Sequence, residues 1–280
     1  MVKVTIPKKI LISVLGTINN FYKMKGSLLK NIIVFLLAIV ATNIVFAQTN
    51  FINLQNSTEK LFSVSTKVED SLKKQFEEKK LRWPPNELYI RSFKYDRQLE
   101  IWVKGDDKET FKLFKIYKVC MQSGSMGPKR FEGDYQVPEG FYYINEFKTN
   151  TNYHLALGLN YPNASDRILS DSLHPGNNIY IHGDCVSTGC IAISDAPIEE
   201  LYVLASQAKI NGQDFIPVHL FPVKYNNRRS LDYLARTTKG NQSLQKFAVS
   251  LKEAYDYFEL NRKLPVVIVN KTGQYIIDRQ

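Results

Sequence analysis

Hydrophobic and polar positions along the chain follow two rhythms, and each predicts a different kind of element. Between residues 57 and 80, apolar side chains recur every three or four positions, which predicts an amphipathic helix. The apolar positions are Leu61, Val64, Val68, Leu72 and Phe76. We expect this helix to end at Trp83–Pro85, because proline cannot continue a helix.

From residue 88 to residue 223 the pattern changes to short runs rich in β-branched and aromatic residues. These runs are LYIRSF, QLEIWVK, FKLFKIYKVC, GFYYINEF, HLALGLNY, NIYIHG and DFIPVHLF. One helical pattern interrupts them at Ile198, Leu201 and Leu204. The region therefore predicts a mainly β fold with flanking helices, in the α+β class.

A polar stretch follows Lys224, and a second helical pattern follows that stretch. Its apolar positions are Leu244, Phe247, Leu251, Tyr255 and Phe258, and two short strands, PVVIVN and YIID, come after it. We divide the chain into an N-terminal extension with a signal peptide (1–47), a helical segment (48–85), a catalytic domain (86–224) and a C-terminal helix with short strands (225–280).

The net charge of +10 is typical of proteins that bind nucleic acids, but the distribution of the charge along the chain argues against such binding. Six of the 37 basic residues and no acidic residue lie in residues 1–47. Without that segment, 31 basic residues stand against 27 acidic ones, and no basic stripe with interleaved aromatics is visible. We therefore expect no nucleic-acid partner.

Residues 1–47 have the pattern of an export signal. Lys25 and Lys30 precede an apolar run over 32–47, and we expect cleavage before Gln48. Translation could start at Met1 or at Met24. The run is short for a spanning helix, so an uncleaved anchor over 32–47 is the alternative. Either way we expect a protein of the periplasm or cell envelope, with membrane contact only through this segment.

Potentially reactive or metal-binding side chains are most concentrated in the segment IHGDCVSTGC, which contains His182, Cys185 and Cys190. A zinc site would need a fourth, distant ligand. A disulfide could pair Cys185 with Cys190, or either of them with Cys120. The third hypothesis is a catalytic pair in which Cys190 forms a thiolate and His182 is its partner. A reactive cysteine needs a base or cation nearby, and we expect the two residues to lie at the ends of adjacent strands.

The motifs favour the third reading because they resemble a known family. HGDCVSTGCIAISD is similar to the signature of the YkuD-type L,D-transpeptidases, and most similar to their YafK-like branch. SGSMGPKRFEGDYQVPEGFYYI and LGLNYPNASD upstream, and SLKEAYDYFELNRKLPVVIV downstream, resemble further family segments in the right order. The resemblance over 88–223 implies a YkuD-type β-sandwich with no metal and no cofactor.

The resemblance also implies roles for residues of the motif. Cys190 matches the nucleophile, His182 the general base, and Gly183 the residue whose carbonyl orients the imidazole. The N–H groups of Gly189 and Cys190 match the oxyanion hole.

Four further residues are expected to bind substrate. They are Ser187, Thr188, Lys129 and Tyr161. We expect Cys120 and Cys185 to be small buried packing residues rather than catalysts.

The implied reaction is acyl transfer from peptidoglycan stem peptides through a thioester on Cys190. The acceptor could be an amine of another stem peptide or of a wall-attached lipoprotein. Water as acceptor would instead make the protein a hydrolase that shortens or releases groups at the diamino acid. The short loop between His182 and Cys190 favours release, whereas the family reaction favours transfer. A non-catalytic wall-binding protein is the remaining alternative.

Overall fold

The computed structural model describes residues 31, 33–35, 37–38, 59–106 and 108–278. The chain divides into two units, Met1–Gln55 and Asn56–Gln280, and the description below concerns the second. The predicted signal peptide and its cleavage site lie outside the described residues, apart from the few between 31 and 38. None of the helices in the described ranges is long and apolar enough to cross a membrane.

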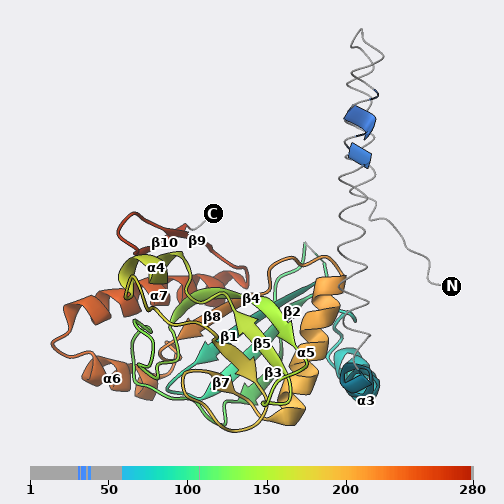
Figure 1. Ribbon diagram of the computed structural model, residues 1–280, viewed down its shortest axis with the longest axis horizontal. Helices are drawn as coiled ribbons and strands as arrows, with labels where there is room; N and C mark the ends of the chain where they lie inside the picture. The colour runs from blue at the N-terminus through green and yellow to red at the C-terminus, as the bar shows by residue number, and fades with distance from the viewer. Residues whose placement is uncertain (1–30, 32, 36, 39–58, 107, 279–280) are drawn as a thin grey trace. The chain divides into compact units, whose positions relative to one another are not determined.

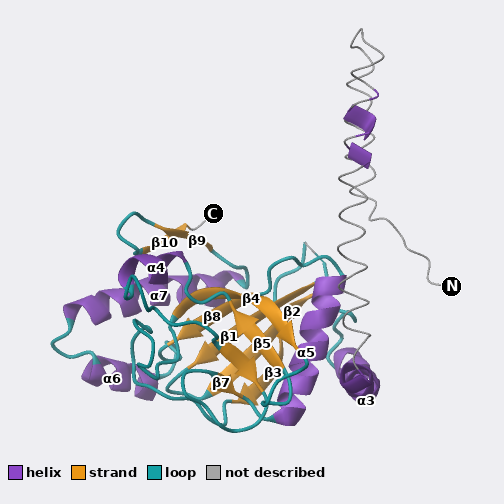
Figure 2. Cartoon of the chain, viewed as in Figure 1, coloured by secondary structure: helices purple, strands orange, loops and turns teal. Residues whose placement is uncertain are grey.

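The described part of the second unit contains helices, one large sheet and one small sheet (Figures 1 and 2). The helices are α3 (Glu59–Glu78), α4 (Ala164–Leu169), α5 (Asp195–Ile210), α6 (Arg228–Thr237) and α7 (Gln242–Asn261). The strands of the large sheet are β1 (Glu87–Phe93), β2 (Gln98–Lys104), β3 (Lys112–Lys118), β4 (Gly140–Lys148), β5 (Ala156–Leu159), β6 (Tyr180–His182), β7 (Ile191–Ala192) and β8 (Pro217–Phe221). The small sheet pairs β9 (Val266–Val269) with β10 (Tyr275–Asp278).

The large sheet is mixed and has the order β3-β2-β1-β8-β4-β5-β6-β7. Two neighbouring pairs, β1 with β8 and β6 with β7, are parallel, and the others are antiparallel. The first half of β4 pairs with β8 and its second half pairs with β5, with a register shift after Ile144. The sheet therefore curls at β4, and the predicted α+β fold is confirmed.

One core joins the two halves of the curled sheet. Ile90 and Ile101 from one half lie in the same buried cluster as Leu157 and Ile181 from the other. Helix α5 lies along the sheet and contributes Leu201 and further apolar side chains to this cluster. Helix α3 packs against α5 through the apolar positions predicted from its sequence, all of which are buried (Figure 1).

The C-terminal segment covers the other side of the β1–β2–β8 region. Phe258 of α7 is buried against the rings of Tyr89, Trp102 and Phe111. Arg91, itself buried, lies 4.8 Å from the Phe258 ring centroid. Residues 225–280 are thus part of the folded unit, because they bury a face of the sheet that would otherwise meet water.

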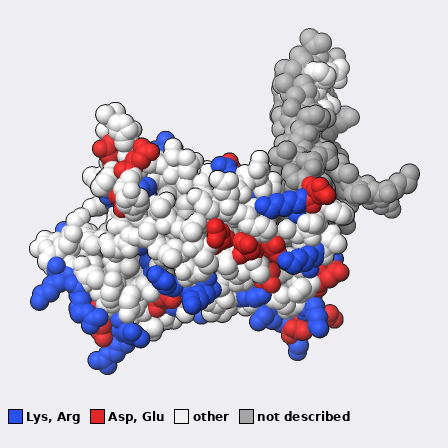
Figure 3. All heavy atoms as spheres, turned by 60° about the horizontal axis from the view of Figure 1, so that its bottom comes forward, with Lys and Arg blue, Asp and Glu red and all other residues white. Residues whose placement is uncertain are grey.

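The structure contains two short helices, α4 and α6, that the sequence pattern did not predict. Helix α6 lies in the stretch predicted to be polar, and only Ser230 and Leu234 of its residues are buried. Helix α4 begins with a capping box in which Asn163 and Asp166 bond each other's backbone N–H groups. Charges of both signs are spread over the face shown in Figure 3, with Lys and Arg densest at the end that holds α6.

Candidate active site

The two residues predicted to react lie on neighbouring parallel strands. His182 ends β6 and is paired with Ala192 of β7, while Cys190 directly precedes β7. Alternate residues of a strand point to the same face, so His182, Ala192 and Cys190 share one face of this pair. The imidazole and the thiol are therefore offset by two residues, roughly 7 Å of strand.

His182 is held as a neutral base. The side chain is only 1% exposed, and Nδ1 lies 2.5 Å from the carbonyl oxygen of Gly183. Because a carbonyl only accepts, Nδ1 carries the hydrogen and Nε2 is left with the lone pair. Burial lowers the pKa of His182, against the opposing effects of the Gly183 carbonyl and the Asp184 charge. The ring of Tyr153 packs at 4.5 Å from the imidazole.

Cys190 is the free thiol of the described chain and is partly exposed. Its Sγ donates to the carbonyl oxygen of Asn178 at 3.7 Å. Burial raises the pKa of this thiol, while the Tyr180 backbone and the Lys129 charge act in the other direction. The raised pKa of Cys190 and the lowered pKa of His182 both favour the neutral forms, a thiol and a neutral imidazole. Within the described contacts, no hydrogen bond joins the two side chains directly.

The hydroxyl group of Ser187 holds the loop before Cys190 in place. Ser187 Oγ donates to the carbonyl of Cys190 at 2.7 Å and accepts from the N–H of Gly189 at 3.3 Å. Gly189 has φ +130°, which favours glycine. The N–H expected to face an oxyanion thus points at Ser187 in this structure. Thr188, the other loop residue expected to meet substrate, is exposed.

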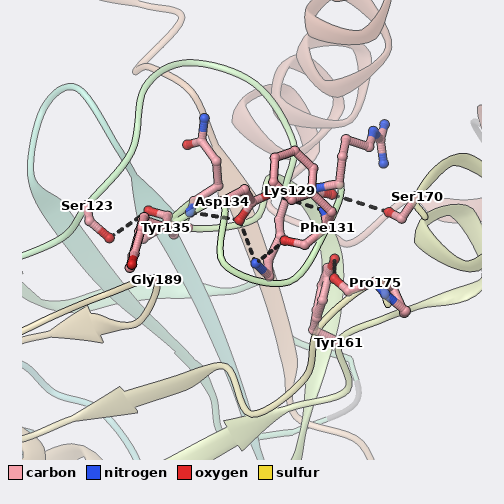
Figure 4. A network of polar contacts seen from close by, with 12 residues as sticks. Ser123, Lys129, Phe131, Asp134, Tyr135, Tyr161, Ser170, Pro175 and Gly189 are labelled. Atoms are coloured by element: carbon pink, nitrogen blue, oxygen red, sulfur yellow. Dashed lines mark hydrogen bonds and ion pairs between the residues drawn. The ribbon is translucent and has the colours of Figure 1, made fainter. Parts of the chain in front are cut away.

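Lys129 and Tyr161 already have partners inside the protein. Lys129 is 5% exposed, and its ammonium donates to Asp134 Oδ1 at 2.5 Å and to the Phe131 carbonyl at 2.9 Å. The buried Tyr161 hydroxyl donates to the Pro175 carbonyl at 2.8 Å. Figure 4 shows these contacts beside Gly189. Lys129 therefore supports its own loop through these bonds.

A disulfide joins Cys120 to Cys185 across 65 positions of sequence. The prediction that both cysteines are buried packing residues is wrong, since Cys120 is partly exposed and Cys185 is exposed. The error came from reading each thiol by its local sequence, although pairing depends on distance in the fold. The disulfide also excludes Cys185 as a zinc ligand, because a sulfur in a disulfide is not a thiolate.

Sequence reasoning missed three residues that shape the site. Tyr153 covers His182, and the Asp195 carboxylate accepts from the N–H of Asp184 at 2.8 Å. Glu139 forms a buried ion pair with Lys94 at 3.1 Å and thereby fixes the loop that contains Lys129. Glu139 lies in the Pro-Glu-Gly part of the upstream motif given above. That motif drew attention to this position, but it did not indicate that Lys94 is the partner of Glu139.

Comparison with known proteins identifies the architecture. The YkuD family, described as "L,D-transpeptidase catalytic domain", matches residues 92–220. A protein of Escherichia coli K12 named "Putative L,D-transpeptidase YafK" is 36% identical over 195 residues, which cover 69% of this chain and 74% of that protein. The chain belongs to the YkuD family of L,D-transpeptidases. Within that family it is YafK-like, as its motifs predicted.

Two solved structures resemble this YkuD protein more remotely. The helical cell shape determining protein Pgp2 of Campylobacter jejuni is 18% identical, with a TM-score of 0.39, over 65% of this chain and 72% of that one. Bd1075 of Bdellovibrio bacteriovorus is 16% identical, with a TM-score of 0.37, over 66% and 78% of the two chains. Neither likeness bears on the assignment.

Proposed function

We propose that this protein is a cysteine acyltransferase that acts on peptidoglycan stem peptides through a thioester on Cys190. One observation carries the proposal: the free thiol of Cys190 directly precedes β7, and the parallel strand β6 beside it ends in His182, whose Nδ1 is anchored. Membership of the L,D-transpeptidase family supports the choice of peptidoglycan as substrate.

The proposed reaction has two transfers. The Cys190 thiol first leaves the Asn178 carbonyl and comes within hydrogen-bond reach of His182 Nε2. His182 Nε2 then takes the thiol proton while Cys190 Sγ attacks the carbonyl of the diamino acid, and the C–N bond to the leaving amine breaks as that amine receives the proton. The acyl group is then a thioester. An acceptor amine attacks this carbonyl, gives its proton to His182, and releases the thiol. Backbone N–H groups of Gly189 and Cys190 stabilise the oxyanion in each step, which requires Gly189 to turn away from Ser187.

Hydrolysis is the second candidate, and the short connection between His182 and Cys190 favours it. Three of the exposed residues in that connection, Asp184, Val186 and Thr188, leave little protein above the thioester to exclude water. In this case water replaces the amine, and the product is a shortened stem peptide or a released wall-attached lipoprotein. Either reaction places the protein outside the cytoplasm, which accords with the export signal predicted over residues 1–47.

The deciding experiment supplies purified tetrapeptide muropeptides with and without excess diamino-acid acceptor and follows the products by mass spectrometry. Transfer predicts exchanged or dimeric product, and hydrolysis predicts only the tripeptide. Cys190→Ala should abolish both, and His182→Ala should lower the rate by about 10² or more. Val186→Ala, an exposed change in the same loop, is the matched control and should keep full activity. Turnover that survives in Cys190→Ala would refute the proposal.

A further inference from the structure

The connection between His182 and Cys190 has little to hold it in place. It joins two parallel strands of three and two residues, so the strands themselves provide a short ladder. At its start, Asp184 donates its N–H to Asp195, and at its end Gly189 is buried. The middle of the connection, residues 185–188, is the part without such anchors.

The hydrogen bonds of residues 185–188 that the structure describes all stay within the connection. The N–H of Cys185 donates to the neighbouring Asp184 carboxylate at 2.6 Å. Ser187 bonds only to Gly189 and Cys190. Val186 is 50% exposed and therefore adds little packing. The disulfide from Cys185 to Cys120 is thus the link between this middle part and the rest of the fold.

Cys120 is a fixed point for this link. Its backbone N–H donates to the carbonyl of Ala192 at 2.9 Å, and the N–H of Ala192 donates to the carbonyl of Met121 at 3.0 Å. Residues 120–121 therefore extend the sheet at the free edge of β7. The disulfide therefore joins Cys185, in the exposed middle of the connection, to the edge of the sheet beside Ala192. Ala192 is two residues after Cys190.

We propose that the Cys120–Cys185 disulfide positions Cys190 for reaction, so that opening it disables the thiol while the fold persists. The inference rests on the proposed function of Cys190 as nucleophile. Without the crosslink, the described hydrogen bonds of residues 185–188 reach only Asp184, Gly189 and Cys190, their neighbours in sequence, so the segment can move Gly189 and Cys190 relative to His182. A displacement of about 1 Å at a reacting group is enough to lower a rate about 10²-fold.

Opening the disulfide is a two-electron reduction. A thiolate of an external dithiol attacks one sulfur, the other leaves as a thiol, and the second thiol of the dithiol completes a cyclic disulfide. The products are two protein thiols and one oxidised dithiol, and Cys190 is unchanged. A reducing environment therefore switches off a protein whose catalytic thiol is itself still reduced.

The experiment compares the oxidised full-length protein with Cys120→Ala/Cys185→Ala, and uses Val186→Ala as the control in the same loop. Circular dichroism and thermal unfolding establish a temperature at which all three are folded. At that temperature we measure kcat and KM on muropeptides, and the pH profile of Cys190 alkylation by iodoacetamide. We expect kcat to fall at least 10-fold with little change in KM, and the alkylation profile to shift in the double variant alone.

The alkylation profile needs no substrate, so it separates this inference from the proposed function. If the native protein turns over no muropeptide, the proposed function fails, and a shift in the profile still supports the positioning role. An unshifted profile, with kcat within 2-fold of the native value where there is turnover, overturns the inference. Labelling of all three cysteines in unreduced protein overturns it as well.

A double variant that does not fold is replaced by a measurement on the native chain. Hydrogen exchange of peptides covering residues 183–190 is compared with and without a phosphine reductant, below the unfolding temperature. Faster exchange confined to this segment supports the inference. Equal exchange in both states, after mass spectrometry confirms the reduction, contradicts it.

Discussion

The buried ion pair between Lys94 and Glu139 offers a quantitative test of how the loop that contains Lys129, beside the candidate site, is held. The two side chains are 3% and 1% exposed and their charged atoms lie 3.1 Å apart. Lys94 Nζ also donates to the carbonyls of Ser125, Gly127 and Val137, and Glu139 Oε1 accepts from the N–H of Gly127 at 2.7 Å. The pair therefore closes the base of the segment from 125 to 139.

Glu139→Gln keeps the shape of the side chain and its acceptor for Gly127, but it leaves the Lys94 ammonium without a counter-charge. Removing one partner of a buried pair costs about 3–5 kcal/mol, because the remaining charge stays desolvated. For a folded unit of this size, this loss corresponds to a fall in Tm on the order of 6–20 °C. Urea unfolding followed by tryptophan fluorescence and circular dichroism gives the free energy directly.

A double-mutant cycle supplies the control. Lys94→Met alone leaves the Glu139 carboxylate buried and unpaired, and we expect a loss of similar size. Lys94→Met/Glu139→Gln removes both charges, so its loss should fall below the sum of the singles by about 2 kcal/mol or more. A loss under about 1 kcal/mol for Glu139→Gln, or additive single effects, would refute the reasoning, since water would then be screening the pair.

Three further predictions follow from single positions. Gly183→Ala should lower kcat at least 10-fold in the muropeptide assay, because the added Cβ would lie 2.8 Å from the backbone oxygen of Tyr153 and would shift the carbonyl that orients the imidazole; an unchanged kcat would contradict the proposed role of that carbonyl. Burial raises the pKa of Asp166 to about 6, so this group should favour folding below pH 4 and lose about 3 kcal/mol of that contribution as pH rises to 6. The difference in unfolding free energy between the native chain and Asp166→Asn, measured across this pH range, should show that slope, and a flat difference would exclude it. Phe258→Ala should destabilise the protein by about 3–5 kcal/mol in urea unfolding, whereas Val249→Ala, 57% exposed on the same helix, should cost little; equal effects would mean that the helix does not cover the sheet.

Local sequence patterns by themselves predicted the first helix and most strands of this protein. The five apolar positions predicted for the first helix are all buried in α3, and each predicted β-rich run between residues 88 and 223 contains a strand. The helix prediction succeeds because the side chains on one face of α3 share a buried environment. The strand predictions succeed because β-branched and aromatic residues concentrate in buried strands such as β1 and β2. Helix α6 escaped detection because it buries little apolar surface, so its sequence resembles a loop.

The local motif likewise predicted where the two candidate residues His182 and Cys190 lie. His182 and Cys190 lie at the ends of adjacent strands, as the short connection between two apolar runs predicted. The carbonyl of Gly183 meets the imidazole because the two groups are neighbours in the chain. Contacts of this kind are encoded within a few residues, and a sequence pattern can therefore report them.

Only the tertiary structure decided the partners of groups that are far apart in sequence. Cys120 reaches Cys185 across 65 positions, and Lys94 pairs with Glu139 although strands β2 and β3 lie between them in the chain. The sequence predicts that Lys129 binds substrate, whereas the fold places its ammonium, buried, on Asp134. A thiol or a charge has the same local signature whether it is free or paired. Its chemistry is set by which atoms the sheet and loops bring within about 3 Å of it, and that proximity is a property of the whole fold.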